Sequence, residues 1–399
     1  MTNPLVVLHV LPDLAVGGGQ ILLLRQIAAK SAGVRHHVAF VRDKRDMQAA
    51  FERAGAACHF VESAGSLGFR KAGRKIAALA RSINASVIHT NNTGLDRRPG
   101  MVAADLAGVP LVNTLHAEGA TKVRSRRGGM KGLITGVARA WEDRLARRVT
   151  RGVIAVSRHV LSSWQWRLDE IGIAESSVRV IHPGLDLTAF DAARGSVPRE
   201  TLRTELLRGR RGPLLVHVGR LAEGKGHYDL IPVIRRVREK FPGVVMLCVG
   251  DGPLRSGFEA DLTRGDVADA FHLTGDRKDV PAILGACDLM LFPSYSEGFG
   301  LAPLEAMAAG IPVVSHNLPS VREFLGEGGM LVPIGGHQEM VEAACSLLLD
   351  VPRAARMGHA GRGIVERSFT VQRFVGQHEA LYREIAGAAG GTGARRSGA

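Results

Sequence analysis

The chain has 399 residues, of which 45% are hydrophobic and 23% charged, and its 49 glycines follow no three-residue period. This composition excludes wholesale disorder and collagen, and the length predicts two domains, because one hydrophobic core stops growing near about 250 residues. The net charge of +14 favours anionic partners such as nucleotides, nucleic acid or an acidic membrane, whereas only 5% aromatic residues argue against a nucleic-acid stacking platform.

Short apolar runs of strand length alternate with stretches of helical periodicity along the whole chain. In the first half the expected strands are residues 5–11, 37–41, 87–90, 111–115, 152–156 and 178–181. In the second half they are residues 214–218, 244–249, 270–273, 289–293, 312–315 and 330–332. The alternation predicts an α/β fold of two doubly wound, Rossmann-like domains that face each other across a cleft. Ligands bind such domains at the carboxyl ends of the strands.

The boundary between the domains is expected where Asp, Arg, Gly and Pro interrupt the pattern, within 186–213. We assign residues 1–188 to an N-terminal domain and 189–370 to a C-terminal one. Residues 371–386 are expected as a helix and the Gly/Ala/Arg/Ser segment 387–399 as a disordered tail.

Targeting signals and cysteine pairs are not apparent in the sequence. No signal-peptide pattern opens it, and no apolar run reaches the roughly 18 residues of a membrane span. The four cysteines are far apart without a CxxC pair, and Cys248 and Cys287 are expected as buried packing residues. A cytoplasmic location is expected.

Glycine-rich loops follow several of the expected strands. After 214–218, residues 219–226 read Gly-Arg-Leu-Ala-Glu-Gly-Lys-Gly and match the spacing of a phosphate loop. Gly226 stands where that motif has Ser or Thr, so the usual magnesium ligand is missing and an NTPase is disfavoured. Arg220 and Lys225 remain as cations that can hold a diphosphate without metal. A solvated surface turn explains this segment, taken alone, about as well.

Two other glycine turns follow strands, at 249–254 and at 275–280. The first is best explained as a structural turn. The second, Gly-Asp-Arg-Lys-Asp-Val, can offer backbone groups to a flat base, although a turn capped by Asp explains it equally well.

The most informative segment follows the expected strand at 289–293. A helix is expected to start near 302–303, so the amides around Phe299, Gly300 and Leu301 form a helix N-terminus that favours an anion. Glu297 lies in the loop and Glu305 is expected in the first helical turn, where both can accept hydrogen bonds from sugar hydroxyls. A helix-dipole partner and a turn residue are the structural alternatives.

The order of these motifs resembles that of the retaining nucleotide-sugar glycosyltransferases with the GT-B fold, of the family 4 type. The resemblance covers most of the chain and rests on VGRLAEGKG (218–226), VGDGPL (249–254), ACDLMLFPS (286–294) and SEGFGLAPLEAMAAGIPVV (296–314). The family's E-x7-E element falls on Glu297 and Glu305.

The resemblance implies a role for each of these residues. Arg220 and Lys225 would bind the donor diphosphate. Glu305 would hold the ribose hydroxyls, and the 275–280 loop, with Arg277 and Val280, would border the base. The donor sugar would be oriented by Glu297 and the amides of Phe299, Gly300 and Leu301.

The N-terminal half carries two matching features. Gly17 and Gly18 resemble the family's glycine loop near the phosphates, whereas Leu22 in place of a third Gly disfavours an NAD site. His116 follows the 111–115 strand and matches the active-site His that touches the donor sugar, although Ala117 replaces the Asp often found after it. His116, Arg220, Lys225 and Glu297 are thus the candidate catalytic residues.

Two structural elements complete the resemblance. Residues 182–186, His-Pro-Gly-Leu-Asp, resemble the family's interdomain hinge, in which Asn commonly replaces the His. Residues 371–385 fit the last helix of the family, which crosses back to the N-terminal domain.

The expected function is transfer of a sugar from a UDP- or GDP-type donor to a hydroxyl of a glycan or lipid-linked acceptor, with retention. Cell-surface polysaccharide or lipopolysaccharide biosynthesis is the expected setting. No DxD motif follows a strand, and neither a metal nor another cofactor is expected. A small soluble acceptor stays open, as does a nucleotide-sugar epimerase or sugar phosphorylase, which E-x7-E disfavours. A nucleic-acid binder is suggested by charge alone, and nucleic acid is not expected as a partner.

Residues 119–151 form a strongly basic segment whose apolar residues recur at helical spacing. A basic amphipathic helix either lies on an anionic membrane surface or packs on its own domain with a solvated face. The first alternative places the protein at the inner face of the cytoplasmic membrane. Its candidate contacts are Lys122, Arg124, Arg126, Arg127, Lys131 and Trp141.

Overall fold

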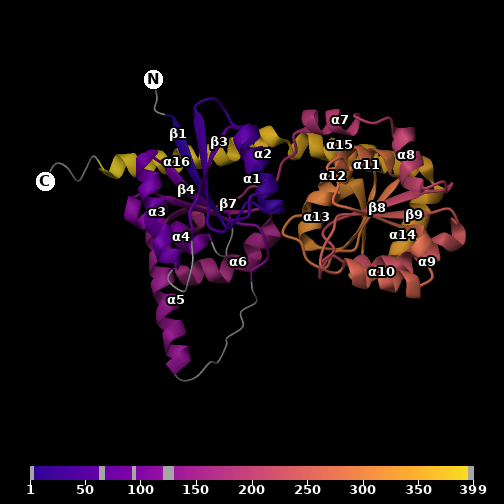
Figure 1. Cartoon of the computed structure of the whole chain (residues 1–399), viewed down its shortest axis with the longest axis horizontal. Coiled ribbons are helices and arrows are strands. Elements are labelled where there is room, and N and C mark those ends of the chain that lie inside the picture. Colours follow the sequence, from indigo (N-terminus) through magenta and orange to yellow (C-terminus); the bar gives the residue numbers. More distant parts are fainter. Residues whose placement is uncertain (1–3, 63–67, 92–95, 120–129, 394–399) are drawn as a thin grey trace. The chain divides into compact units, whose positions relative to one another are not determined.

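The computed structural model describes residues 4–62, 68–91, 96–119 and 130–393, with side chains described for 137–388 of the last segment. The chain divides into two compact units. Unit 1 comprises Met1–Gly184 and Val371–Ala399, and unit 2 comprises Leu185–Thr370. Figure 1 shows the elements of both.

Unit 1 is built on a seven-stranded parallel sheet in the order β3-β2-β1-β4-β5-β6-β7. Its strands are β1 (Leu5–Leu11), β2 (Val34–Phe40), β3 (Ala56–Phe60), β4 (Val87–Thr90), β5 (Leu111–Leu115), β6 (Thr150–Ala155) and β7 (Val178–Val180). Its helices are α1 (Gly18–Ala28), α2 (Gln48–Arg53), α3 (Gly68–Ser82), α4 (Arg97–Ala107), α5 (Met130–Val149), α6 (Arg158–Ile171) and α16 (Val371–Gly393). The order reverses between β1 and β4, which is where doubly wound sheets bind ligands.

Unit 2 repeats this plan with six parallel strands in the order β10-β9-β8-β11-β12-β13. These are β8 (Leu214–Val218), β9 (Val245–Val249), β10 (Phe271–Gly275), β11 (Leu289–Phe292), β12 (Val313–His316) and β13 (Gly329–Val332). The helices are α7 (Leu187–Arg194), α8 (Arg199–Leu207), α9 (Leu230–Lys240), α10 (Arg255–Arg264), α11 (Val280–Ala286), α12 (Leu301–Ala309), α13 (Pro319–Leu325), α14 (His337–Leu349) and α15 (Val351–Ser368). Here the order reverses between β8 and β11.

The predicted α/β class and its two doubly wound halves are confirmed, and every expected strand is present within a few residues of its expected bounds. One strand of unit 1 was not expected. β3 lies at the sheet edge, where only Ala56 of its five residues is buried, so it lacks the apolar run that marks the other strands. Cys248 and Cys287 are buried, as expected.

The domain boundary differs slightly from the prediction. The units divide between Gly184 and Leu185, rather than after residue 188. At the start of unit 2, the Leu185 amide donates to Phe369 O at 2.8 Å, and Asp186 caps α7 by accepting from the Ala189 amide at 3.0 Å. The alternation of strands and helices is interrupted within 186–213 because two short helices, α7 and α8, follow each other there without a strand between them. Both helices belong to unit 2.

The last helix belongs to unit 1, where α16 packs against α1, β4 and β6 (Figure 1). Its Tyr382 is fully buried and accepts a hydrogen bond from Gln26 at 3.0 Å. The expected disordered tail from residue 387 is wrong in part, because α16 continues to Gly393, while 394–399 lie outside the described residues.

Candidate active site

The loops that follow β8 and β11 meet at the carboxyl edge of the unit 2 sheet, because these strands are neighbours at the point of reversal. The Tyr295 amide donates to Gly224 O at 2.8 Å and joins the two loops. Gly226 has φ +69°, and a Cβ there would lie 1.9 Å from Pro293 O. The close approach of the loops therefore explains why a glycine stands where a phosphate loop has Ser or Thr.

Lys225 and Glu297 form an ion pair in which the Lys Nζ and Glu Oε1 are 2.7 Å apart. Ser294, which sequence reasoning missed, donates from its Oγ to the same oxygen at 3.0 Å. Both side chains of the pair are partly covered, with 32% of Lys225 and 15% of Glu297 exposed. An ammonium group has three donors, so Lys225 can hold Glu297 and still donate to an anion.

Arg220, the second cation of this loop, is exposed. Among the residues that the structure describes, its guanidinium has no hydrogen bond or ion pair. A planar fork of donors is therefore available to a phosphate beside the Lys225–Glu297 pair.

Backbone hydrogen bonds join the loops after β8, β9 and β10. The Gly219 amide donates to Val249 O at 3.0 Å, and the Gly250 amide donates to Gly275 O at 2.9 Å. Gly250 has φ +126°, and a Cβ there would lie 2.3 Å from Gly219 O, so the turn requires glycine. This bears out the structural interpretation of the turn at 249–254 and gives the site a rigid base.

Arg277 and Val280 lie at the end of β10, next in line along the same edge. The Arg277 guanidinium donates to both carboxylate oxygens of Asp279, at 2.8 and 2.7 Å, and this interaction raises the pKa of Arg277 and lowers the pKa of Asp279. Val280 begins α11. The Arg277 side chain is thus bonded within its own loop, which agrees with the interpretation of 275–280 as a turn held by Asp. The backbone of this loop follows directly after β10.

Helix α12 begins at Leu301, slightly earlier than expected, and the buried Gly300 precedes it with φ +105°. Its first amides have no carbonyl of their own helix to donate to, and they point from the carboxyl edge of the sheet. Glu305 is the fifth residue of the helix, so it lies just beyond the first turn where it was expected. The Phe299 side chain is buried and stacks on Phe324 with ring centroids 4.6 Å apart, so it belongs to the packing beneath the loop.

His116 follows β5 in unit 1, where a Cβ at Gly19 would lie 3.7 Å from its Nε2. Gly17 and Gly18, at the start of α1, belong to the same loop. The Nε2 of His116 is buried and has no partner among the described residues. Burial and then His378 lower the pKa of His116 to about 4, so the imidazole is neutral near pH 7 and can form one more hydrogen bond.

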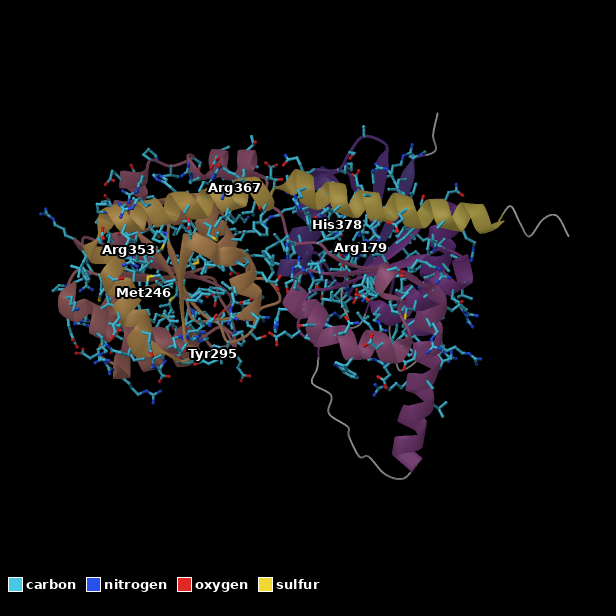
Figure 2. All side chains as sticks on the ribbon, turned by 180° about the vertical axis from the view of Figure 1, so that it is seen from behind. Arg179, Met246, Tyr295, Arg353, Arg367 and His378 are labelled. Carbon is cyan, nitrogen blue, oxygen red and sulfur yellow. The ribbon has the colours of Figure 1, made fainter. Side chains whose placement is uncertain are left out.

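Buried histidines behind His116 are a feature that sequence reasoning missed. His9 Nε2 and His36 Nδ1 are 2.9 Å apart, and His89 lies 2.7 Å from both Thr114 Oγ1 and the Tyr382 hydroxyl. His378, on α16 (Figure 2), lies beside His89 and contacts Phe374 O at 2.9 Å through Nδ1. Desolvation lowers the pKa of each of these histidines, so unit 1 has a core of neutral imidazoles.

The basic segment is described only in part. Lys122, Arg124, Arg126 and Arg127 lie outside the described residues, as does the side chain of Lys131. On the described part of α5, Leu145 and Val149 are in the unit 1 core, as expected of a helix packed on its own domain. Trp141 is 38% exposed and lies against Phe69, with ring centroids 6.0 Å apart.

In the described part of the chain, no three His, Cys, Asp or Glu side chains are arranged to hold a metal ion. No helix in the described residues is long and apolar enough to cross a bilayer.

Two family models match the chain. The model described as "Glycosyl transferases group 1" matches residues 212–350, and the model described as "Glycosyltransferase Family 4" matches residues 17–189. They fall on units 2 and 1 respectively, and together they include every candidate donor and catalytic residue.

Curated relatives are glycosyltransferases as well. The 2-deoxystreptamine glucosyltransferase of Streptomyces kanamyceticus is 28% identical over 295 residues, which span 72% of this chain and 74% of the relative. The lipopolysaccharide core biosynthesis mannosyltransferase LpsB of Rhizobium meliloti is 29% identical over 151 residues, 36% of this chain and 43% of the relative.

Among solved structures, Anabaena HepE in complex with UDP and glucose has a TM-score of 0.78 at 22% identity, with 94% of this chain and 98% of that chain covered. WaaG, a glycosyltransferase involved in lipopolysaccharide biosynthesis, has a TM-score of 0.65 at 18% identity, with 96% and 98% covered. At these identities the similarity shows the fold alone, and the matched residues cover both units of this chain. The motifs, the two family models and the fold agree: the chain belongs to the GT-B glycosyltransferases of the family 4 type.

Proposed function

We propose that this glycosyltransferase moves a sugar from a nucleoside-diphosphate sugar of the UDP or GDP type to a hydroxyl of a glycan or lipid-linked acceptor, with retention of anomeric configuration. The observation that carries the proposal is the 2.7 Å Lys225–Glu297 pair beside the exposed Arg220 and the start of α12. The cations and the helix amides suit the anionic diphosphate of such a ligand, and the carboxylates suit its sugar hydroxyls. HepE, a neighbour in fold, was solved with UDP-glucose, which supports a donor of this class.

The proposed reaction places the charge of the leaving group on the cations. The bond between the anomeric carbon and the diphosphate oxygen breaks, and its electron pair stays on the nucleoside diphosphate. Arg220, Lys225 and the α12 amides stabilise that charge as it develops, which is the largest contribution such groups make to rate. The acceptor hydroxyl attacks from the face that the diphosphate leaves, and its proton passes to a phosphate oxygen.

The carboxylates and His116 orient the donor in this proposal. Glu297 and the amides of Phe299, Gly300 and Leu301 hold the sugar, and Glu305 holds the ribose hydroxyls. His116, kept neutral by burial, offers one hydrogen bond to the donor sugar. Arg220 and Lys225 neutralise the leaving diphosphate, which is the task of Mg²⁺ in metal-dependent enzymes, so the reaction is proposed to need no metal.

Product analysis tests the reaction. With a panel of α-linked UDP and GDP sugars and a lipid-linked acceptor extract, we expect an α-linked product by NMR and an unchanged rate in excess EDTA. A β-linked product would contradict retention, and loss of rate in EDTA that Mg²⁺ restores would contradict metal independence. Donor consumption without an acceptor would instead favour an epimerase or another enzyme class.

The acceptor is proposed to be met at an anionic membrane surface, and described residues of α3 support this. Arg70, Lys71, Arg74 and Lys75 are exposed on one helix that has no acidic residue. The Arg70 guanidinium lies 5.3 Å from the ring centroid of the exposed Trp141, so a basic face continues into an aromatic edge. Basic residues with an adjacent Trp are typical of helices that lie at a bilayer interface. LpsB and WaaG, both linked by name to lipopolysaccharide, support a lipid-borne acceptor and a place in cell-surface glycan synthesis.

Vesicle flotation tests the membrane proposal. Wild-type protein is expected to float with vesicles that contain an anionic lipid at low salt, and to do so less as salt increases. Charge reversal by Arg74→Glu and Lys75→Glu is expected to weaken partitioning onto the vesicles by about 30-fold or more, because each basic residue contributes about 1 kcal/mol at such a surface. The matched control Lys240→Glu and Arg356→Glu, exposed in unit 2, should float as the wild type does. Absence of binding at low salt would point to a soluble acceptor.

A further inference from the structure

An open cavity of about 870 Å³ lies at the amino-terminal edge of the unit 2 sheet. Its lining includes Pro213 and Pro312, which directly precede β8 and β12, and Leu289, which begins β11. Because all six strands are parallel, this edge is the opposite one from the loops that carry Lys225 and Glu297. The cavity is therefore separate from the candidate donor site.

The charged side chains of the lining are mostly basic. Four arginines line the cavity, Arg194, Arg199, Arg203 and Arg362, against two carboxylates, Asp288 and Glu366. Asp191 and Glu200 also contact these arginines, but they are not part of the lining. The lining itself thus carries two more basic than acidic side chains, and the carboxylates of Asp191 and Glu200 balance these charges from outside it.

Two of the arginines are held firmly. Arg203 donates to Asp288 Oδ2 at 2.7 Å and to Ala286 O at 2.8 Å, and Arg362 donates to Asp191 Oδ2 and Ala308 O, each at 2.7 Å. Ala286 and Ala308 lie at the carboxyl ends of α11 and α12, so these two guanidinium groups serve as helix caps.

Arg194 and Arg199 are held loosely. The contacts of Arg194 with Asp191 and Ala309 O are 3.5 and 3.3 Å long. Those of Arg199 with Glu200, Asp288 and Gly285 O are 3.2, 3.4 and 3.3 Å long. Their side chains are 43% and 51% exposed, and they stand at the end of α7 and the start of α8. They can turn toward a ligand at little cost, because their present bonds are long and weak.

One part of the lining, the apolar wall, has hydrophobic side chains. It is formed by Ile311, Leu347, Leu348, Val351 and Ala354, and Val351 at 66% exposure leaves hydrophobic surface open to solvent. The volume far exceeds that of a bare anion and lies in the range of sites for organic ligands, about 300–1,000 Å³. Charge and volume together describe an anionic group carried on an organic body.

We propose that this cavity binds a small phosphate ester, with the phosphate on Arg194 and Arg199 and the organic body against the apolar wall. A phosphate monoester carries about −1.5 to −2 charges at pH 7, so it can take the place of the Asp191 and Glu200 carboxylates as the partner of these two arginines. Two guanidinium forks from different helices can each donate a pair of hydrogen bonds to its oxygens.

Calorimetric titration of the full chain with phenyl phosphate, in the presence of saturating UDP, tests the proposal. Phenyl phosphate is expected to bind, and to bind more tightly than inorganic phosphate or phenol. The Arg194→Ala/Arg199→Ala variant should weaken it by about tenfold or more for each arginine. The variant Ala355→Trp, which fills the cavity without removing a charge, should abolish binding. The exposed Arg356→Ala on the same helix should bind as the wild type does.

Four results would overturn the proposal. The first is that phenyl phosphate does not bind, and the second is that both cavity variants bind it as tightly as the wild type does. The third is that inorganic phosphate binds as tightly as phenyl phosphate. The fourth is that UDP competes with phenyl phosphate, which would place the probe in the donor site. Far-UV circular dichroism checks each variant, and the Trp variant keeps the test valid if loss of the arginines disturbs helices α7 and α8.

Discussion

Replacement of Lys225 by Ala is expected to lower kcat/KM for the nucleotide sugar by about 100-fold or more, because a fixed charge is removed from the place where the leaving group becomes negative. A second effect adds to the first. Without its partner at 2.7 Å, the Glu297 carboxylate is left uncompensated beside the donor phosphates and repels them. Initial rates with the natural donor, followed by release of nucleoside diphosphate, measure the change.

The two effects can be separated with a second substitution. In Lys225→Ala/Glu297→Gln the repulsion is gone, so KM is expected to recover in part while kcat stays low. The matched control Lys240→Ala removes an exposed lysine of the same unit and should leave both constants unchanged. Wild-type turnover in Lys225→Ala would reject the assignment of this residue to the diphosphate.

Acid is expected to destabilise unit 1 well above the pH at which carboxylates titrate. His36, His116 and His378 have pKa values of about 4 in the folded chain against 6.5 for an ordinary histidine, since burial disfavours the imidazolium. The unfolded chain therefore binds more protons as the pH falls below about 6.5. The free energy of unfolding then decreases by up to about 1.4 kcal/mol per pH unit for each such histidine, down to about pH 4.

The three tryptophans make this measurable, because Trp141, Trp164 and Trp166 all lie in unit 1. Urea unfolding followed by Trp fluorescence should show a steep loss of stability between about pH 6.5 and pH 4. His378→Phe is expected to reduce the slope by up to one proton, whereas the exposed His359→Gln in unit 2 should not change it. Two charged neighbours act on His36, with Lys30 lowering and Glu379 raising its pKa. A flat profile across this range would contradict a neutral imidazole core.

Strand positions and the two-unit plan could be predicted from the sequence because buried parallel strands are continuous apolar runs, as in Leu289–Phe292. β3 could not, because four of its five residues are not buried and its side chains give no such run. The sequence also placed the boundary too late, since short helices such as α7 and α8 resemble a linker when Gly and Pro surround them. Helix α16 could be predicted, but not its end, because residues 386–393 include four glycines, whose low helix propensity argues against the helix that the structure shows there.

For the candidate site, the sequence placed the right residue types in loops at strand ends, but not their contacts. The pairing of Lys225 with Glu297 follows from β8 and β11 being neighbours, which is a property of sheet order and not of either motif. Arg277 was expected to border a ligand, yet Asp279, two residues away, holds its guanidinium. The buried histidines had one signal in the sequence, because His9 interrupts the otherwise apolar run Leu5–Leu11.

The central claim is that Arg220 and Lys225 bind the diphosphate of the donor, and thermal shift with UDP, GDP and ADP tests it directly. Because a ligand that binds the native state raises its stability by mass action, at least one of the three should raise the unfolding temperature of the wild type. The Arg220→Ala/Lys225→Ala variant should lose most of that increase while unfolding at the same temperature without nucleotide. An equal increase in the variant, or none in the wild type with any of the three, would contradict the claim.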